Sequence, residues 1–494
     1  MKPLKTLALS IGIPENELNC PEMPIVDIAY NSKKAGEGVI FVCIVGAVSD
    51  GHRYAADAYA KGSRVFVCEK KIDLPSDALI FHVKNTRRAL ALLSAVFFDH
   101  PEKKLRVIGV TGTKGKSTSC EMIRHILTEN GISAASVGTV GVRIGNTVTP
   151  TGNTTPESYE LFRIFSEMVN KNVQYAVIEV SSQGIKMDRI YGIPFYATVM
   201  TNLSEDHIGG AEHPDFEDYK QCKKALFTRT EIGFFNADDE YFDEFFDFAS
   251  CKKITYAHRE DADYTAKALI PTITEKGFGT SFILVHENEH TDVFVPFPGE
   301  FSVSNALAAI AVSDHIGVSP QKAATALSSV RVNGRFEIVP TAITNAVFVI
   351  DYAHNGESLS AALRALRVYR PARLICLFGS VGGRTEIRRR ELGIAASEYA
   401  NLSILTSDNP DGEPPLDIIY DIAKHMQGAS YVVIPDRKDA LEYAVSIANA
   451  GDIILFAGKG HENYQLIDGK KQPFFEKQII TAAAEKIALS SKKV

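Results

Sequence analysis

The sequence lacks any pair of cysteines at the Cys-x-x-Cys spacing that is typical of zinc sites and redox motifs. Its seven cysteines are scattered and odd in number: Cys20, Cys43, Cys68, Cys120, Cys222, Cys251 and Cys376. Scattered, unpaired cysteines are typical of proteins that work in a reducing compartment. The pattern therefore predicts a cytoplasmic protein without a zinc site.

The sequence also lacks a surplus of basic residues and a long apolar run at its N-terminus. Lys and Arg number 53 against 60 Asp and Glu, a formal net charge of −7, and this balance argues against a general nucleic-acid binder. Any anionic ligand must then be held by local basic groups and backbone donors. The apolar stretch near Met1 is too short for a signal peptide or a membrane span, so no membrane partner is expected.

The length and the alternation of apolar strands with helical patterns predict an α/β protein of three domains. At 494 residues the chain is too long for one core, and no internal repeat or low-complexity tract is present. Alternating strands and helices imply parallel sheets with ligands at the carboxyl ends of the strands. The polar stretch His100–Lys104 forms the first linker. The expected domains are residues 1–102, 103–332 and 333–494.

One stretch carries a strong nucleotide signal. The apolar run Val107–Val110 breaks into Gly112-Thr-Lys-Gly-Lys-Ser117, and apolar residues then follow at helical spacing. Such a strand, glycine loop and helix bind polyphosphates through backbone N–H groups and the helix N-terminus. We expect Lys116 to reach the terminal phosphates and the Ser117 hydroxyl to bind Mg²⁺. The strict pattern has glycine where this chain has Val110.

Polar residues also follow the next predicted strands of the central domain. Glu179 closes the apolar run 174–180, and His207 follows the run 196–200. A carboxylate and a histidine at strand ends beside a phosphate loop are placed to bind a metal ion. Lys223 lies in a predicted amphipathic helix, 219–227, with Tyr219 and Cys222 facing inward. By itself, that pattern makes its lysines a solvated face.

Four strands of the third domain also end in polar clusters. They are Asp351-Tyr-Ala-His354, Gly379-Ser-Val-Gly-Gly-Arg384, Asp408-Asn-Pro410 and Gly458-Lys-Gly-His-Glu462. Because parallel strands end at one edge of a sheet, these clusters predict half of an active site, the phosphate loop being the other half.

In these and further motifs the chain resembles the Mur ligases, the ATP-dependent amide-bond-forming enzymes of bacterial cell-wall precursor synthesis. Further matches are Asn31-Ser-Lys33, Asp50-Gly-His52, Gly152-Asn-Thr-Thr-Pro-Glu157, Glu179-Val-Ser-Ser182, Asn236-Ala-Asp-Asp239, Asn305, Gly334-Arg335-x-Glu337 and Asp436-Arg437. Within the family it is most similar to the members that add the third amino acid to UDP-N-acetylmuramoyl-L-Ala-D-Glu.

The resemblance implies a three-domain architecture: a small α/β UDP-binding domain, a central ATPase-like domain with a parallel sheet, and a Rossmann-like domain that binds the amino acid. It implies a monomeric, ADP-forming ligase that uses ATP, Mg²⁺, UDP-N-acetylmuramoyl-dipeptide and a free diamino acid. The substrate carboxylate would form an acyl phosphate, which the amine of the amino acid then attacks.

The resemblance also assigns roles to residues. For catalysis it implies Lys116, Lys223, Arg335 and His354. For ATP it implies Gly112, Thr113, Lys114, Gly115, Lys116, Ser117, Thr118, Asn305, Arg335, Asp351 and Arg384. For the UDP-sugar it implies Ser32, Asn153, Thr154, Thr155, Ser181 and Arg189. For the amino acid it implies Arg384, Asp408, Asn409, Asp411, Gly458 and Glu462. For metal it implies Ser117 at a first Mg²⁺ and Glu179, His207 and Lys223 at a second, with Lys223 as an N-carboxylated lysine.

Departures from the family pattern leave the acceptor open. Lys114 stands where the family has asparagine, and Gln183 where it has histidine. Asp411 replaces the arginine with which diaminopimelate enzymes bind the distal carboxylate. An acid there attracts a distal ammonium and favours L-lysine, unless Arg388 or Arg389 supplies the missing charge.

Two other functions remain as alternatives. One is a related ligase that adds glutamate to folate, against which the first-domain matches speak. The other is a non-catalytic nucleotide binder, against which the complete set of Lys116, Ser117, Glu179, His207 and Lys223 speaks.

Overall fold

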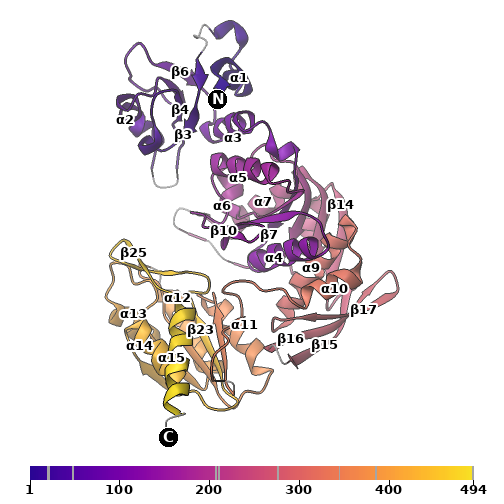
Figure 1. Cartoon of the computed structure of the whole chain (residues 1–494). Coiled ribbons are helices and arrows are strands. Elements are labelled where there is room, and N and C mark those ends of the chain that lie inside the picture. Colours follow the sequence, from indigo (N-terminus) through magenta and orange to yellow (C-terminus); the bar gives the residue numbers. More distant parts are fainter. Residues whose placement is uncertain are drawn as a thin grey trace. The chain divides into compact units, whose positions relative to one another are not determined.

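The computed structural model describes residues 1–18, 23–46, 49–205, 208–209, 212–274, 277–343, 345–383 and 386–491 (Figure 1). The chain folds into two compact units, Met1–Thr265 with Ser304–Ala326, and Ala266–Val303 with Leu327–Val494. Three α/β regions, each with its own main sheet, confirm the predicted fold class. The boundaries at 102/103 and 332/333 remain predictions. Among the described helices, none combines the length and apolarity needed to cross a bilayer.

The N-terminal region is built on a parallel four-stranded sheet. Its strands, in spatial order, are β3 (Asp27–Ala29), β4 (Val39–Val42), β5 (Val65–Cys68) and β6 (Leu79–His82). β4 and β5 are buried on both faces, which explains their unbroken apolar sequences. The other elements here are β1 (Lys2–Pro3), α1 (Leu4–Ser10), β2 (Pro24–Ile25), α2 (Ala55–Ala60) and α3 (Thr86–Phe97).

The predicted linker is a tight corner rather than an open loop. Asp99 and His100 both have positive φ, 62° and 49°, and the short 3-10 turn Pro101–Lys103 follows them. The His100 imidazole and the buried Glu102 carboxylate lie 2.9 Å apart. The chain then enters the first strand of the next sheet.

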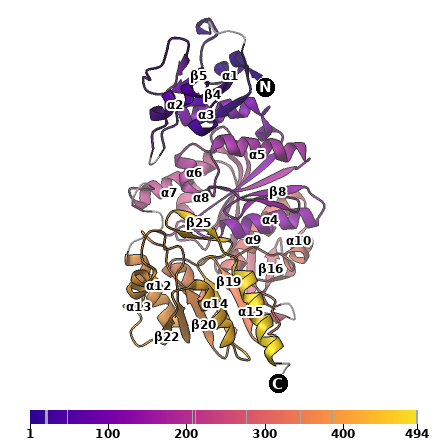
Figure 2. The same cartoon turned by 60° about the vertical axis from the view of Figure 1, so that its left-hand side comes forward.

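The central region contains a larger, mainly parallel sheet. Its strands in spatial order are β10 (Thr147–Thr149), β9 (Gly141–Ile144), β8 (Ala134–Gly138), β11 (Tyr175–Glu179), β7 (Arg106–Thr111), β12 (Phe195–Met200), β13 (Thr230–Asn236) and β14 (Lys252–Ala257). Only β9 and β10 run antiparallel in this part. Helices α4 (Lys116–Glu129) and α5 (Ser158–Asn170) lie on opposite sides of the sheet (Figure 2).

Further helices belong to this part of the chain. They are α6 (Ser182–Lys186), α7 (Phe216–Lys224), the 3-10 segment Ala225–Arg229, α8 (Phe242–Phe248), α9 (Glu300–Ile316) and α10 (Pro320–Leu327). The phosphate-loop strand and helix predicted from the sequence are thus β7 and α4. β7, β11 and β12 are parallel neighbours, so Thr111, Glu179 and Met200 end at the same edge of the sheet.

The second unit holds an antiparallel hairpin and a doubly wound sheet. β16 (Gly277–His286) pairs with β17 (Glu289–Val295) after the long strand β15 (Tyr264–Thr274). The sheet has the order β18 (Glu337–Ile338), β19 (Val347–Asp351), β23 (Ile453–Ala457), β20 (Leu374–Phe378), β21 (Leu402–Leu405), β22 (Tyr431–Val433). All but β18 are parallel, and β19, β20, β21 and β23 are the four strands predicted to end in polar clusters.

Helices cover both faces of that sheet. One set is α11 (Gly356–Arg367), α12 (Glu386–Tyr399) and α13 (Pro415–Ala423), and the other is α14 (Arg437–Ser446) and α15 (Glu476–Ser491). Phe348, Ile350 and Phe456 pack with Leu441 of α14 and Ile480 of α15. A separate hairpin, β24 (Tyr464–Ile467) and β25 (Lys470–Pro473), follows β23.

A buried ion pair joins α14 to α15 and gives a test of this packing. Arg437 Nε donates to Glu476 Oε1 at 2.7 Å, and the two side chains are 0% and 2% exposed. Glu476→Gln leaves the guanidinium buried without a counter-charge, so we expect the free energy of unfolding to fall by about 3 kcal/mol, measured by urea denaturation. Glu442→Gln, which removes an exposed partner of Lys438 on the same helix, is expected to cost under about 0.5 kcal/mol. Equal losses in both variants would contradict this account.

Candidate functional site

The glycine loop after β7 is fixed by the segment that follows β12. Thr113 N donates to Asn202 O at 2.8 Å, and Lys114 N donates to Asn202 Oδ1 at 2.9 Å. Gly112 has φ +140°, and a Cβ there would collide with Thr201 Oγ1. Gly115 has φ +84° and is the N-cap of α4. The loop therefore requires glycine at both positions, as a phosphate-binding turn does.

Two lysines converge on this loop. Lys116 Nζ donates to Gly112 O and Thr113 O, both at 2.9 Å, and Lys223 Nζ donates to the same Gly112 O at 2.9 Å. Two ammonium groups on one carbonyl concentrate positive charge where the helix N-terminus also favours an anion. A polyphosphate is the ligand that suits this charge.

The interpretation of Lys223 as part of a solvated lysine face is wrong. Its side chain is 1% exposed, and Nζ lies 4.6 Å from the centre of the Tyr219 ring. Tyr219 Oη in turn lies 3.1 Å from Thr113 Oγ1. Cys222, expected to face inward, is partly exposed instead. Tyr219 anchors α7 (Phe216–Lys224) to the glycine loop, and Lys223, on the same helix, therefore reaches that loop.

Glu179 is held at the end of β11 by the turn after β8. Its carboxylate accepts hydrogen bonds from Thr139 N at 2.8 Å and Thr139 Oγ1 at 3.2 Å, and its side chain is 3% exposed. Thr139 Oγ1 also lies 3.0 Å from Thr154 Oγ1. The carboxylate and the loop at Thr154 are therefore positioned together.

The donor set for the expected metal fits Mg²⁺ only in part. Ser117 and Glu179 supply oxygen atoms, which Mg²⁺ prefers. Lys223 offers no acceptor as an ammonium, so it fits the ion only as a carbamate. Ser117 was expected at a first Mg²⁺ and the others at a second. His207, the remaining ligand expected at the second ion, lies outside the described residues, as does Arg384.

Four of the residues expected at the UDP-sugar form one hydrogen-bonded network. Thr154 bonds Thr139, and Thr155 Oγ1 donates to Glu179 O at 2.9 Å and lies 3.0 Å from Ser181 Oγ. Arg189 Nη1 donates to Thr155 O at 3.1 Å. Asn153 is exposed on the same loop, whereas Ser32 lies in the N-terminal region, where its carbonyl accepts from Lys61.

An unpredicted carboxylate connects this network to the N-terminal region. Glu157 accepts hydrogen bonds from Arg189 Nε at 2.8 Å and from Arg87 Nη1 of α3 at 3.0 Å. Arg87 Nε also donates to Val45 O at 2.7 Å. Glu157 lies in one of the sequence motifs that resemble the Mur ligases, so the sequence contained a signal for it. Arg87 lies in none of these motifs.

Asn305 lies beside the phosphate loop on α9. Its Oδ1 accepts from Ser119 Oγ of α4 at 3.1 Å, and a Cβ on Gly115 would collide with the same atom. This places an amide next to the first turn of α4. The position suits a contact with the nucleotide, as the sequence predicts.

Within the second unit, Arg335, Asp351 and His354 belong to one cluster around Tyr352. The Arg335 guanidinium lies 4.7 Å from the centre of the Tyr352 ring, and the rings of His354 and His461 lie 4.8 and 4.9 Å from it. Asp351 accepts from Phe336 N and Ala353 N, and burial raises its pKa.

His461 is a member of this cluster that had no predicted role. Burial, reinforced by the nearby Arg335 and Lys459 charges, lowers the pKa of His461 to about 4. The imidazole is therefore neutral at physiological pH. The cluster offers a guanidinium and several rings to a ligand, and His461 adds no charge.

The residues expected to bind the amino acid surround a fully buried lysine. Lys459 Nζ lies 2.9 Å from Asn409 Oδ1, 3.1 Å from Glu462 Oε2 and 3.4 Å from Asp408 Oδ1. Gly458 has φ +107°, and a Cβ there would approach Asp408 Oδ2 to 2.7 Å. The structure thus brings Asp408, Asn409, Gly458 and Glu462 together.

Asp411 and Arg389 have structural partners of their own. Asp411 has φ +52°, is exposed, and its Oδ1 accepts from Gly469 N at 2.7 Å in the turn between β24 and β25. Arg389 is 4% exposed and pairs with Glu413 at 2.6 Å and Asp421 at 2.9 Å. Two carboxylates therefore already balance the guanidinium proposed as a substitute for the missing arginine.

Gly138 gives a direct test of the role of Glu179. A Cβ at position 138 would collide with Glu179 Oε1, so Gly138→Ala must displace the carboxylate. We expect the affinity for Mg²⁺ with an ATP analogue, measured by titration calorimetry, to fall about tenfold or more. In the control Gly36→Ala the nearest atom is 4.0 Å away, and binding should be unchanged. Unchanged binding in Gly138→Ala would remove Glu179 from the metal site.

Comparisons with known proteins agree with this geometry. The family model described as Mur ligase middle domain matches residues 110–313, and that described as Mur ligase, glutamate ligase domain matches residues 334–460. A relative from Clostridium acetobutylicum, UDP-N-acetylmuramoyl-L-alanyl-D-glutamate--2,6-diaminopimelate ligase 1, is 38% identical over 476 residues, 95% of this chain and 97% of its own length. The ligase of that name from Caldanaerobacter subterraneus is 36% identical, covering 97% of this chain and 98% of its own.

Solved structures show the same fold. A UDP-N-acetylmuramoyl-L-alanyl-D-glutamate--2,6-diaminopimelate ligase has a TM-score of 0.69 and 28% identity, covering 97% of this chain and 99% of its own. A MurF ligase from Thermotoga maritima in complex with ADP has a TM-score of 0.64 at 19% identity, covering 94% of this chain and 98% of its own. The family models, the relatives and the fold lead to one conclusion: the chain belongs to the Mur ligase family.

Proposed function

We propose that this protein is the ATP-dependent, ADP-forming ligase that adds a diamino acid to UDP-N-acetylmuramoyl-L-Ala-D-Glu in peptidoglycan precursor synthesis. The observation that carries the proposal is the convergence of Lys116 and Lys223 on the Gly112 carbonyl at the end of a phosphate-loop strand. Further support comes from relatives of 36–38% identity that span nearly the whole chain and carry this name, with diaminopimelate as the amino acid.

The reaction requires activation of a carboxylate by phosphoryl transfer. An oxygen of the substrate carboxylate attacks the γ-phosphorus of ATP, the bond to the β,γ-bridging oxygen breaks, and an acyl phosphate and ADP result. The amine of the amino acid then attacks the acyl carbon, a proton leaves the nitrogen, and phosphate departs. The protein's work is mainly positioning and charge neutralisation.

The residues around the phosphate loop would neutralise the transferred charge. The Lys116 ammonium, which now contacts the Gly112 and Thr113 carbonyls, would move to the terminal phosphates, and Lys116 to Thr118 would contribute the backbone N–H donors of the first turn of α4. Ser117 would hold a first Mg²⁺, and Glu179, His207 and the carbamate of Lys223 would hold a second. Both ions would supply charge neutralisation when bound. Arg335, His354 and Arg384 are assigned to the phosphates, Asn305 to adenine, and Asp351 to the ribose.

Carbamylation of Lys223 is part of the proposal. The amine must be neutral to react with CO₂, and burial disfavours the ammonium form. The carbamate would turn a buried cation into an oxygen ligand. Its present hydrogen bond to Gly112 O would be lost, which would free that side of the loop for the phosphates.

The UDP-sugar peptide is assigned to Ser32, Asn153, Thr154, Thr155, Ser181 and Arg189. Thr155 links Glu179 to Ser181, so a peptide bound at this network would hold its carboxylate near the metal ligands. We further propose a monomeric, cytoplasmic enzyme, in keeping with the scattered cysteines.

The amino acid is assigned to Arg384, Asp408, Asn409, Asp411, Gly458 and Glu462. Two observations favour an acceptor with a distal ammonium, L-lysine, over meso-diaminopimelate. Asp411 adds negative charge where an arginine is expected, and Arg389 is already paired with Glu413 and Asp421. The names of the relatives favour meso-diaminopimelate, so the experiment must compare both.

The alternative of a folate-type ligase rests on fold alone. A folylpolyglutamate synthase from Mycobacterium tuberculosis has a TM-score of 0.62 at 15% identity and covers 81% of this chain. The N-terminal sheet and the network of Arg87, Glu157 and Arg189 instead favour a substrate that the first region helps to hold.

The test is release of phosphate from ATP and Mg²⁺ in the presence of UDP-N-acetylmuramoyl-L-Ala-D-Glu. Parallel reactions contain L-lysine, meso-diaminopimelate or no amino acid. We expect amino-acid-dependent release with L-lysine at least about tenfold faster than with meso-diaminopimelate, because one lost charge pair at a binding site costs over about 1.4 kcal/mol. A preference for meso-diaminopimelate would support the proposed ligase activity but refute the role given to Asp411.

Lys116→Ala is the control for the nucleotide site. It should reduce turnover at least about a thousandfold while the thermal unfolding profile stays intact, because the charge on the terminal phosphates is lost. If the wild-type protein released no phosphate with either amino acid, the proposed acceptor class would be refuted. Turnover by Lys116→Ala would refute the phosphate loop as the catalytic site.

A further inference from the structure

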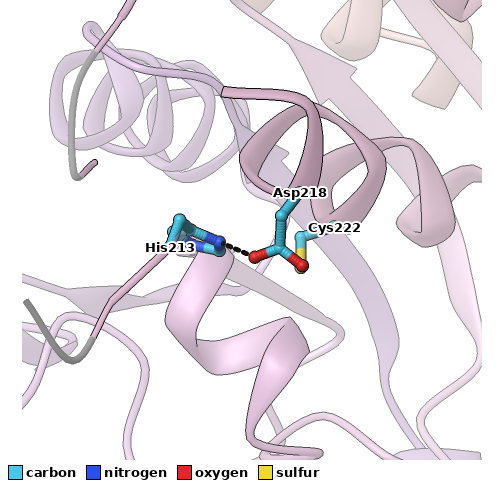
Figure 3. Close-up of side chains that lie close together, drawn as sticks. All are labelled: His213, Asp218 and Cys222. Carbon is cyan, nitrogen blue, oxygen red and sulfur yellow. Dashed lines mark hydrogen bonds and ion pairs between the residues drawn. The ribbon is translucent and has the colours of Figure 1, made fainter. Parts of the chain in front are cut away.

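Three side chains of types that bind metal ions lie close together, two on α7 and one just before it. They are His213, Asp218 and Cys222, and one ligand atom from each lies within 4.8 Å of the others (Figure 3). Asp218 and Cys222 are four residues apart on α7 and therefore share one face of the helix. His213 comes from the segment just before the helix, whose N-cap is Asp215.

His213 has surroundings typical of a metal-binding histidine, with one ring nitrogen beside a carboxylate and the other without a partner in the described part of the chain. Its side chain is 0% exposed, and Nδ1 lies 2.6 Å from Asp218 Oδ2. Its Nε2 has no hydrogen-bond partner among the described residues. Burying a polar atom in this way costs about 1–3 kcal/mol. A fold retains such an imidazole more readily where it also serves to bind a ligand.

We propose that His213, Asp218 and Cys222 bind Zn²⁺ or a similar divalent ion, at a site separate from that for Mg²⁺. Nitrogen and sulfur donors beside one carboxylate suit Zn²⁺, whereas Mg²⁺ takes oxygen ligands. A tetrahedral zinc ion keeps its ligand atoms about 3.3–3.8 Å apart. One ligand atom from each of the three side chains already lies within 4.8 Å of the others, so small side-chain rotations bring the atoms into that range.

Neighbouring groups hold one oxygen of the Asp218 carboxylate and leave the other for the proposed ion. Lys186 Nζ donates to Asp218 Oδ2 at 2.7 Å and to Glu212 O at 3.1 Å, and His213 Nδ1 contacts the same Oδ2, so we assign Oδ1 to the ion. Hydrogen-bonded carboxylate ligands are usual in metal sites. Cys222 is partly exposed, which gives the ion a path and leaves its fourth position to water.

A metal ion here would brace the helix that presents Lys223. The His213 ring lies 5.2 Å from the Tyr219 ring, and Tyr219 contacts both Thr113 and Lys223. Joining His213 to α7 would restrain that helix. Cys-x-x-Cys spacing, on which the prediction of no zinc site rested, could not reveal a site of one histidine, one aspartate and one cysteine.

The test uses Co²⁺ as a spectroscopic substitute for Zn²⁺ on the full chain, after chelation and with excess Mg²⁺. We expect one Co²⁺ per chain, with the sulfur-to-cobalt absorption that a thiolate ligand produces, and loss of this absorption on adding Zn²⁺. Cys222→Ser should abolish the absorption. Cys251→Ser, which changes another partly exposed cysteine, should leave it as in the wild type.

His213→Gln should weaken Co²⁺ binding about tenfold or more. Circular dichroism melting of the metal-free variants checks that each is folded. The proposal is overturned if the wild type gives no sulfur-to-cobalt absorption, or if Cys222→Ser retains it. Neither readout measures ligase turnover, so failure here and failure of the proposed function are distinguishable.

Discussion

The described part of the proposed active site depends on the fixation of the glycine loop 112–117 by Thr201 and Asn202. Neighbouring parallel strands bring these residues together, because β7 lies between β11 and β12 and all three end at one edge. The Asn202 carbonyl and amide oxygen hold two consecutive loop N–H groups. The Gly112 and Thr113 carbonyls then accept from Lys116, which brings positive charge to the loop, and the Gly112 carbonyl also accepts from Lys223.

Glu179 extends that constraint to the substrate side. Its carboxylate is fixed by Thr139, and its own carbonyl is fixed by Thr155, so one residue connects the expected metal to the expected peptide site. Glu157 then carries the connection through Arg87 to the N-terminal region. A ligase must hold a carboxylate, a phosphoryl donor and a metal in register, and this chain of hydrogen bonds provides a physical means of doing so within the first unit.

The sequence predicted the strands and the strand-end clusters well, because buried parallel strands read as unbroken apolar runs and their polar ends stand out. Lys116, Ser117 and Glu179 were singled out as site residues in this way, and that role stays a prediction. Lys223 was not, because a helical pattern of lysines looks solvated until the partner is known, and the partner, Gly112, lies 111 residues away. The ion pairs of Arg389 and Arg87 could not be predicted for the same reason, because their carboxylate partners are distant in the sequence.

The central claim is that a substrate carboxylate is activated by phosphoryl transfer, and an isotope experiment tests it most directly. The carboxylate of the D-Glu residue that accepts the new amide bond is labelled with ¹⁸O, and the phosphate released during ligation is analysed by mass spectrometry. The acyl phosphate mechanism predicts that each phosphate carries one oxygen from the labelled carboxylate. Phosphate without the label, or with oxygen from ¹⁸O-labelled water instead, would contradict it.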